Sequence, residues 1–193
     1  MNFKIIISWF LTIIVIPICI VIILLWKFNI IKYKTCAQII SIVPGILGIF
    51  LRRIFYKITL KKCGENLNVF WGAVIVYSDV EIGNNCTIEE FCIISHCKIG
   101  NDVIFAANVS VMSGAKHHDV NDITTSFYNS KSECRKLSLG NNLWIGTHAV
   151  IMNDIGSNCA IGAGAVVTKS IPDMTVAVGV PAKVIKTRGV SNE

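Results

Sequence analysis

The chain has 193 residues, of which 53% are apolar and 16% are charged, and its mean hydropathy is +0.61. This balance is too apolar for an ordinary soluble domain and predicts a membrane segment. Residues 1–64 carry nine Lys and Arg and no acidic residue, whereas residues 65–193 carry nine basic and twelve acidic residues. The larger part of the chain therefore lacks the basic stripe of a nucleic-acid-binding surface, and we expect no nucleic-acid partner.

Residues 5–26 form a run without a charge. As a helix this run spans about 33 Å, against about 30 Å for the hydrocarbon core of a bilayer. It is too long for a signal peptide, and no small-residue cleavage site follows it. We therefore predict a transmembrane anchor over residues 1–34. Because only Lys4 precedes the run and many basic residues follow it, the positive-inside rule predicts a protein of the bacterial inner membrane whose later part faces the cytoplasm.

Residues 35–63 are predicted to form a re-entrant or interfacial amphipathic helix. The apolar residues before position 52 are interrupted by Pro44 and Gly45 and are too few for a second span. From Ile46 onward, apolar residues recur in pairs four apart, and the remaining directions carry basic side chains. This pattern suits an anionic membrane surface. The alternative is a helix that packs on its own domain, which we favour less because the polar side is purely cationic.

From about residue 64 a six-residue repeat replaces the helical period. The repeated apolar residues fall into four groups of three, namely Ile82, Ile88 and Ile94; Ile99, Phe105 and Val111; Leu139, Ile145 and Ile151; and Ile155, Ile161 and Val167. Short β segments cannot bury an apolar face alone, so the coils must stack about 4.8 Å apart into a solenoid. We assign this domain to residues 64–186 and a tail to residues 187–193. None of the eight cysteines forms a Cys-x-x-Cys pair, and we expect reduced, small apolar side chains.

Three segments carry a family resemblance: residues 139–146 (LGNNLWIG), 161–172 (IGAGAVVTKSIP) and 178–185 (VGVPAKVI). They resemble the hexapeptide-repeat acyltransferases. The resemblance implies an all-β, left-handed parallel β-helix, a homotrimer, and acetyl-CoA as co-substrate between neighbouring subunits. With an N-terminal membrane segment, the chain is most similar to the membrane-associated sugar O-acetyltransferases. The implied acceptor is a sugar hydroxyl of a surface polysaccharide or of its lipid-linked glycan precursor.

The repeat is interrupted by residues 113–136, which are too polar for a coil and too long for a turn, so this loop should protrude. Acetyl transfer to a hydroxyl needs a base, and a neutral imidazole suits that role near pH 7. The loop begins SGAKHHD, and family resemblance gives the position of the base to His117. His118 takes the role if the register shifts by one residue. The alternative is that both are solvated loop histidines.

His96 is a competing candidate, because it resembles the base of the sugar-nucleotide N-acyltransferases of the same fold. It also resembles one zinc ligand of the hexapeptide-type carbonic anhydrases. The second histidine of that motif would stand at Phe91, so we expect no metal. Two other functions therefore remain open: an N-acetyltransferase of an amino sugar or nucleotide sugar, and a non-catalytic membrane-tethered scaffold.

The resemblance also assigns acetyl-CoA contacts to six residues of the last coils. The pantetheine arm would lie beside Thr147 and Ala163, with Thr168 and Lys169 beyond them. Lys183 and Lys186 would reach the phosphates, where cations are most effective if partly desolvated. The alternative for these two lysines is ordinary surface charge.

Overall fold

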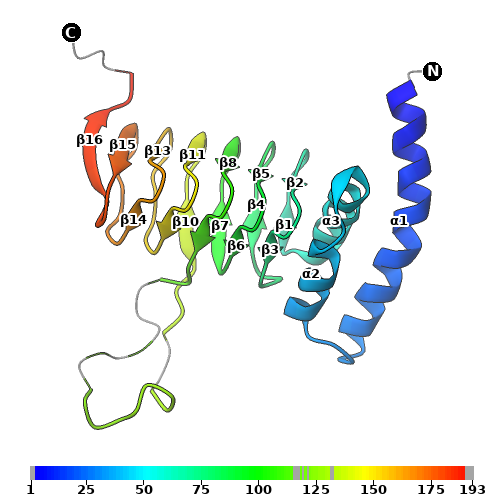
Figure 1. The fold of residues 1–193 in the computed structure, drawn as a ribbon, viewed down its shortest axis with the longest axis horizontal. Helices are drawn as coiled ribbons and strands as arrows, with labels where there is room; N and C mark the ends of the chain where they lie inside the picture. Colours follow the sequence, from blue (N-terminus) through cyan, green and yellow to red (C-terminus); the bar gives the residue numbers. More distant parts are fainter. Residues whose placement is uncertain (1–2, 115–117, 119, 121, 131–132, 190–193) are drawn as a thin grey trace.

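The computed structural model describes residues 3–114, 118, 120, 122–130 and 133–189, with side chains described from residue 12 onward. Within this part of the chain, three helices precede sixteen short strands (Figure 1). The helices are α1 (Phe3–Lys27), α2 (Tyr33–Ser41) and α3 (Gly45–Thr59). They lie together at one end of a stack of β coils, and the last strand lies at the other end (Figure 1).

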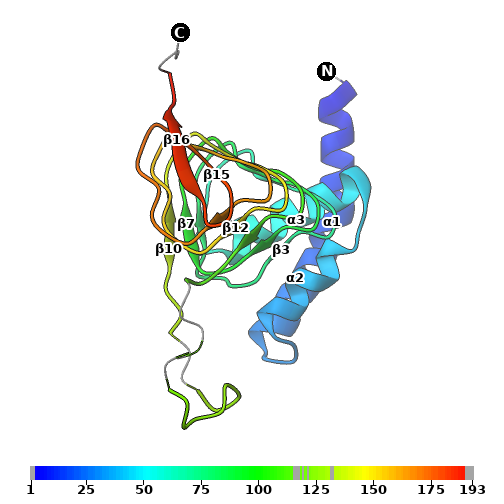
Figure 2. The same ribbon diagram turned by 60° about the vertical axis from the view of Figure 1, so that its left-hand side comes forward.

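The strands form three sheets, which are the three faces of a parallel β-helix, and Figure 2 shows its three-sided outline. The four-stranded sheet contains β1 (Lys62–Cys63), β4 (Glu81–Ile82), β7 (Cys97–Ile99) and β10 (Leu137–Leu139), and single bridges at Ile155 and Ile171 extend it. The five-stranded sheet contains β3 (Val74–Ile75), β6 (Ile93–Ile94), β9 (Ser110–Val111), β12 (Val150–Ile151) and β14 (Val166–Val167).

The seven-stranded sheet contains β2 (Asn68–Val69), β5 (Thr87–Ile88), β8 (Val103–Phe105), β11 (Leu143–Ile145), β13 (Ala160–Ile161), β15 (Thr175–Val178) and β16 (Lys183–Thr187). All pairs are parallel except β15 with β16, which is antiparallel. The stacked β solenoid predicted from the repeat is therefore present, and it is a parallel β-helix, as the family resemblance implies.

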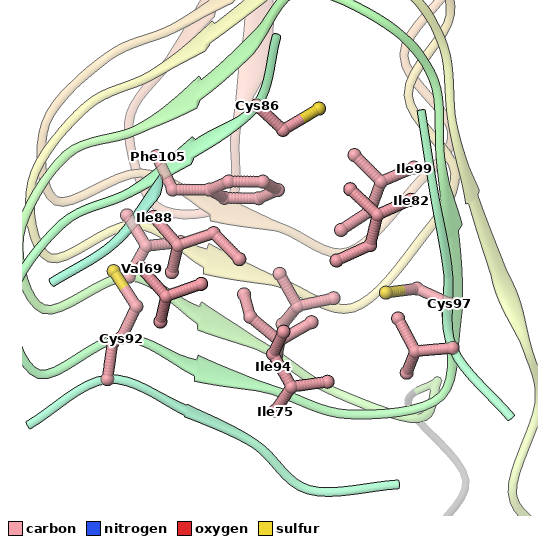
Figure 3. Close-up of a cluster of buried hydrophobic side chains, with 14 of the residues drawn as sticks. Val69, Ile75, Ile82, Cys86, Ile88, Cys92, Ile94, Cys97, Ile99 and Phe105 are labelled. Atoms are coloured by element: carbon pink, nitrogen blue, oxygen red, sulfur yellow. The ribbon is translucent and has the colours of Figure 1, made fainter. Parts of the chain in front are cut away.

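The interior of the β-helix is a column of stacked apolar side chains (Figure 3). All twelve residues of the predicted repeat are at most 2% exposed. Cys86, Cys92, Cys97 and Cys159 are free thiols buried in the same column. Burial raises the pKa of Cys97 to about 12, so this thiol stays protonated and acts as a small packing group. The column explains these four cysteines without any redox or metal chemistry.

The basic side of α3 faces the protein and covers the first coil. The Arg52 side chain is completely buried, and its Nε donates to Val69 O (2.8 Å). Its Nη1 donates to three further carbonyls, at Ile40 (3.0 Å), Ser41 (3.3 Å) and Val43 (2.8 Å). Val69 O lies on the open edge of β2, because no further coil precedes β2 in its sheet, whereas the other three carbonyls lie at or just after the C-terminal end of α2.

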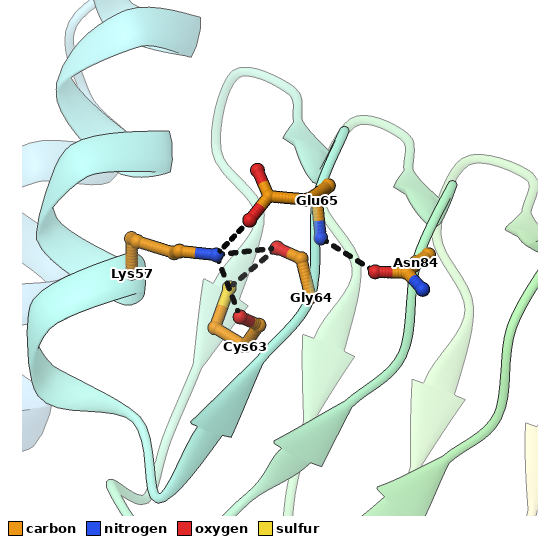
Figure 4. A network of polar contacts seen from close by, with 5 residues as sticks. All are labelled: Lys57, Cys63, Gly64, Glu65 and Asn84. Atoms are coloured by element: carbon orange, nitrogen blue, oxygen red, sulfur yellow. Dashed lines mark hydrogen bonds and ion pairs between the residues drawn. The ribbon is translucent and has the colours of Figure 1, made fainter.

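The next basic residues of α3 continue this cap. Arg53 Nε donates to Leu67 O at 2.8 Å, beside the start of β2. Lys57 Nζ donates to Cys63 O (3.1 Å) and pairs with Glu65 (2.6 Å), whose backbone N–H is held by Asn84 (Figure 4). The predicted interfacial membrane helix is therefore wrong, and the alternative of a helix that packs on its own domain is correct. The cationic side chains serve as donors to the edge of the first coil.

The predicted transmembrane anchor is also wrong. In the part of the chain that the structure describes, no helix combines the length and apolar character that a bilayer crossing requires. The apolar run forms α1, but one stripe of it, Val15, Cys19 and Ile22, is buried within the protein. Cys19 Sγ donates to Leu51 O of α3 at 3.6 Å. Since the inner-membrane location was inferred from this anchor, that prediction is withdrawn with it.

Replacing Arg52 with Met should lower the free energy of unfolding by about 3 kcal/mol or more, because each buried carbonyl left without a donor costs about 1–3 kcal/mol. Lys98 on β7 is exposed, and Lys98→Met should change stability by less than about 0.5 kcal/mol. Urea unfolding followed by circular dichroism measures both. Equal effects would contradict a capping role for Arg52.

Candidate active site

Six of the predicted site residues lie on two corners of the β-helix, at the two ends of the strands of the five-stranded sheet: His96, His118, Thr147, Ala163, Thr168 and Lys169. We call the turns from this sheet to the four-stranded sheet the loop corner; their described residues include 76–80, 95–96, 112–114, 133–136, 152–154 and 168–170. The turns that enter the five-stranded sheet from the seven-stranded sheet form the second corner, which includes residues 146–149 and 162–165.

The interrupting loop follows β9 and precedes β10, and its described residues 122–130 lie away from the coils (Figures 1 and 2). His117 lies outside the described residues. His118 is exposed, its Nδ1 lies 2.6 Å from Ser130 Oγ, and its ring meets the edge of Phe127. One imidazole nitrogen of His118 is therefore occupied inside the loop.

Two neighbouring cations fasten the base of this loop to the coils on either side. Arg135 Nη1 pairs with Asp154 Oδ2 at 2.7 Å, and its Nη2 donates to Asn153 Oδ1 at 2.9 Å, in the following coil. Lys136 Nζ donates to Asp79 O (2.5 Å) and to Glu81 Oε1 (3.1 Å), nearer the N-terminal end. These contacts keep the loop base in a fixed position.

The carboxylates that Lys136 and Arg135 contact, those of Glu81 and Asp154, are held in their charged form. Lys61 and Lys136 both contact Glu81, and together they lower the pKa of this carboxyl to about 2. Burial alone would raise the pKa of Asp154. The bonds from Arg135 and from the Ser138 N–H (2.8 Å) outweigh burial, so that the pKa is lowered.

His96 lies one coil before the loop, on the same corner. Its Nδ1 is 2.8 Å from Asp79 Oδ1, and its ring stacks on Tyr77 with centroids 3.6 Å apart. Because the carboxylate can only accept, His96 carries its proton on Nδ1 when neutral, and Nε2 is left as an acceptor. Sequence reasoning missed Asp79, although the two residues stand 17 positions apart, the same offset that pairs Glu81 with Lys98. The coil length was therefore the signal that could have found this pair.

The predicted acetyl-CoA residues divide between the two corners. Thr147 and Ala163 lie on the second corner, where Gly164 N–H donates to Thr147 O at 2.8 Å. The Thr147 hydroxyl is already used, since it donates to Ala107 O at 2.6 Å. Thr168 and Lys169 lie on the loop corner and are exposed. The two pairs therefore lie at opposite ends of the strands of the five-stranded sheet.

Lys183 and Lys186 are exposed on β16, where they pair with Val178 and Val176 of β15. The segment before β16 returns to the five-stranded sheet, because Ala182 N–H donates to Val166 O at 2.8 Å. Both lysines therefore belong to the last coils, beside β14. Among the described residues, no group of three or more His, Cys, Asp or Glu side chains is arranged to hold a metal ion.

No protein-family model matches the chain. Over 138 residues the chain is 42% identical to the galactoside O-acetyltransferase of Escherichia coli K12, an alignment that covers 64% of this chain and 62% of that protein. Over 135 residues it is 32% identical to the putative lipopolysaccharide biosynthesis O-acetyl transferase WbbJ of the same strain, covering 64% and 65%. The chain therefore spans slightly less than two thirds of the length of these curated relatives.

A solved structure of a galactoside acetyltransferase in complex with coenzyme A has a similar fold. The TM-score is 0.68 at 28% identity, and the match covers 80% of this chain and 78% of that chain. The similarity therefore extends over most of the β-helix.

Glu81 should make stability depend on pH. Its pKa in the folded protein is about 2, below the ordinary value of 4.5. Its ion pairs therefore stabilise the fold above about pH 4.5, and this contribution is lost as the pH falls toward 2. Glu81→Gln should reduce stability at pH 7 and flatten the decline between pH 4.5 and 2, as measured by urea unfolding across that range. Glu133 is exposed and forms no ion pair among the described residues, so Glu133→Gln should leave the profile unchanged.

Proposed function

We propose that this chain is an acetyltransferase of the hexapeptide-repeat family, which transfers the acetyl group of acetyl-CoA to a sugar hydroxyl. The observation that carries this proposal is the loop corner. Arg135 and Lys136 fix the end of the loop that contains His117 at this corner. Thr168 and Lys169 lie on the same corner two coils further along the chain. The corner would therefore bring a base and a co-substrate together.

The last coils fit a long, thin thioester co-substrate. Ala163 is small and exposed, and a Cβ built on the neighbouring Gly164 would meet no atom within 4 Å. The second corner is thus open to the close approach of a pantetheine arm. Lys169, Lys183 and Lys186 are exposed cations suited to its phosphates. These residues fit acetyl-CoA better than a bulky prosthetic group.

When bound, acetyl-CoA supplies the acetyl thioester. The acceptor oxygen forms the new bond to the acetyl carbon, and the carbon–sulfur bond breaks. We assign His117 the role of taking the proton of the attacking hydroxyl and passing it to the departing thiolate. A direct attack of this kind needs no covalent enzyme intermediate. The cysteines of the core are buried and are not available as nucleophiles, and burial also raises the pKa of Cys92 and Cys97.

We assign the acceptor to a sugar of a bacterial surface polysaccharide or its lipid-linked precursor. Support comes from the relatives, one named for galactosides and one for lipopolysaccharide biosynthesis. A second candidate function is N-acetylation of an amino sugar, favoured by the hydrogen bond between His96 and Asp79.

We also propose that the chain works as a homotrimer. Ile104 is 44% exposed and Trp144 is 51% exposed on adjacent strands of the seven-stranded sheet. Exposed apolar residues grouped in this way mark interaction surfaces. Light scattering after gel filtration should give three times the 21.2 kDa mass of the chain, and a monomer mass would contradict the proposal.

His117→Ala should lower the rate of acetyl transfer by about a hundred- to ten-thousand-fold, the usual scale for a general base, and leave the affinity for acetyl-CoA unchanged. The wild-type rate should rise with pH through about 6–7, as an imidazole near its ordinary pKa loses its proton. Transfer kinetics and calorimetry measure these quantities.

His118→Ala is the matched control and should cost much less. If His96→Ala abolishes transfer while His117→Ala keeps it, the base is His96 and the N-acetyltransferase alternative gains support. If acetyl-CoA does not bind at all, the chain is a scaffold and both enzymatic proposals fail.

A further inference from the structure

A cleft of about 480 Å³ lies between the start of α2 and the loop corner of the first two coils. Its wall includes Lys32 and Lys34 on the helical side and Tyr77, Ser78, Asp79 and His96 on the coil side. The volume lies within the range of small-molecule sites, so the cleft is too small for a protein or nucleic-acid partner.

The cleft carries an excess of positive charge. Lys32 and Lys34 are exposed, and within the described part of the chain neither forms an ion pair. Asp79 is the acidic residue of the wall, and its carboxylate is already bonded to His96. The two ammonium groups outnumber this one carboxylate, so the wall is net positive, and a lysine pair of this kind attracts phosphate oxygens.

The coil side of the cleft offers a wall for a polar ring. Tyr77 and His96 are stacked with their rings 17° from parallel, which gives a rigid aromatic surface. Ser78 presents a hydroxyl, and His96 Nε2 is an acceptor when Nδ1 is bonded to Asp79. These groups suit the hydroxyls of a sugar, whereas the lysines suit its charged substituent.

Hydrogen bonds connect this cleft to the base of the loop. Leu137 N–H donates to His96 O at 3.0 Å, and Lys136 Nζ donates to Asp79 O at 2.5 Å. The cleft therefore adjoins the base of the loop to which the proposed function assigns the general base. The cleft and the loop can therefore act on one acceptor.

We propose that this cleft binds the phosphate or diphosphate group of the acceptor sugar, through Lys32 and Lys34. The proposal rests on the proposed acetyltransferase function and narrows its acceptor to a sugar esterified with phosphate. A nucleoside diphosphate sugar and a lipid diphosphate sugar share this chemistry.

The test uses the full chain saturated with coenzyme A, so that the cations of the acetyl-CoA site are already occupied. Inorganic pyrophosphate is titrated by calorimetry at low salt. It should bind, and the double variant Lys32→Gln/Lys34→Gln should weaken binding tenfold or more. Lys62→Gln/Lys98→Gln is the matched control, because these two exposed lysines lie on the four-stranded sheet. The control variant should bind like the wild type.

Pyrophosphate that fails to bind, or that binds both double variants equally, would overturn the proposal. Coenzyme A titrated into the same proteins tests the proposed function separately, since a protein that binds pyrophosphate but no coenzyme A would contradict only the acetyltransferase. Uridine diphosphate and geranyl diphosphate then separate the two sources of the diphosphate. Tighter binding of either one than of pyrophosphate supports an esterified group, and tighter binding of neither contradicts it.

Discussion

The end of the solenoid is the constraint on which the rest of the structure depends. Each coil of a parallel β-helix satisfies its backbone groups through the coils before and after it, so the first coil has an open edge. Helix α3 closes this edge with Arg52, Arg53 and Lys57, which donate to carbonyls in or beside β1 and β2. Tyr56 accepts the N–H of Ile75 in β3 at 3.1 Å. One helix thus serves all three faces of the first coil, and every later coil can be built on that base.

Stacking also decides where chemistry can occur. Residues one coil apart lie beside each other, so a corner gathers side chains that are distant in the sequence. Asp79 meets His96 in this way, and Lys136 returns from the loop to contact the same turn. The interior accepts only apolar groups and the faces are flat, which leaves the corners for cations, imidazoles and protruding loops.

The six-residue repeat of the sequence predicted which side chains are buried inside the β-helix. It did not predict which parts of the chain pack on the outside of the coils. The buried column follows from spacing alone, since every apolar residue at the repeat must point inward. The spacing of apolar residues does not reveal that Arg52 donates to Val69 O, because no sequence pattern identifies the backbone carbonyls at the open edge of a coil. Hydropathy likewise does not show that Val15, Cys19 and Ile22 pack within the protein. Site residues could be proposed from the sequence only where a motif exists, as around His117, whereas Asp79 and Lys34 belong to no motif.

The charge asymmetry of the chain follows from the same architecture. The acid-free N-terminal third supplies donors to a coil edge rich in carbonyls, where acidic side chains would compete with the backbone for those donors. Arg52, Arg53 and Lys57 are used in this way, and Lys61 pairs with Glu81 of the second coil. These contacts account for the cations of α3 and for Lys61 but not for Lys32 and Lys34 at the start of α2. Lys32 and Lys34 line the cleft and form no ion pair among the described residues, so they are available to a ligand. The basic residues of α3 thus stabilise the fold, whereas those at the start of α2 are free to bind.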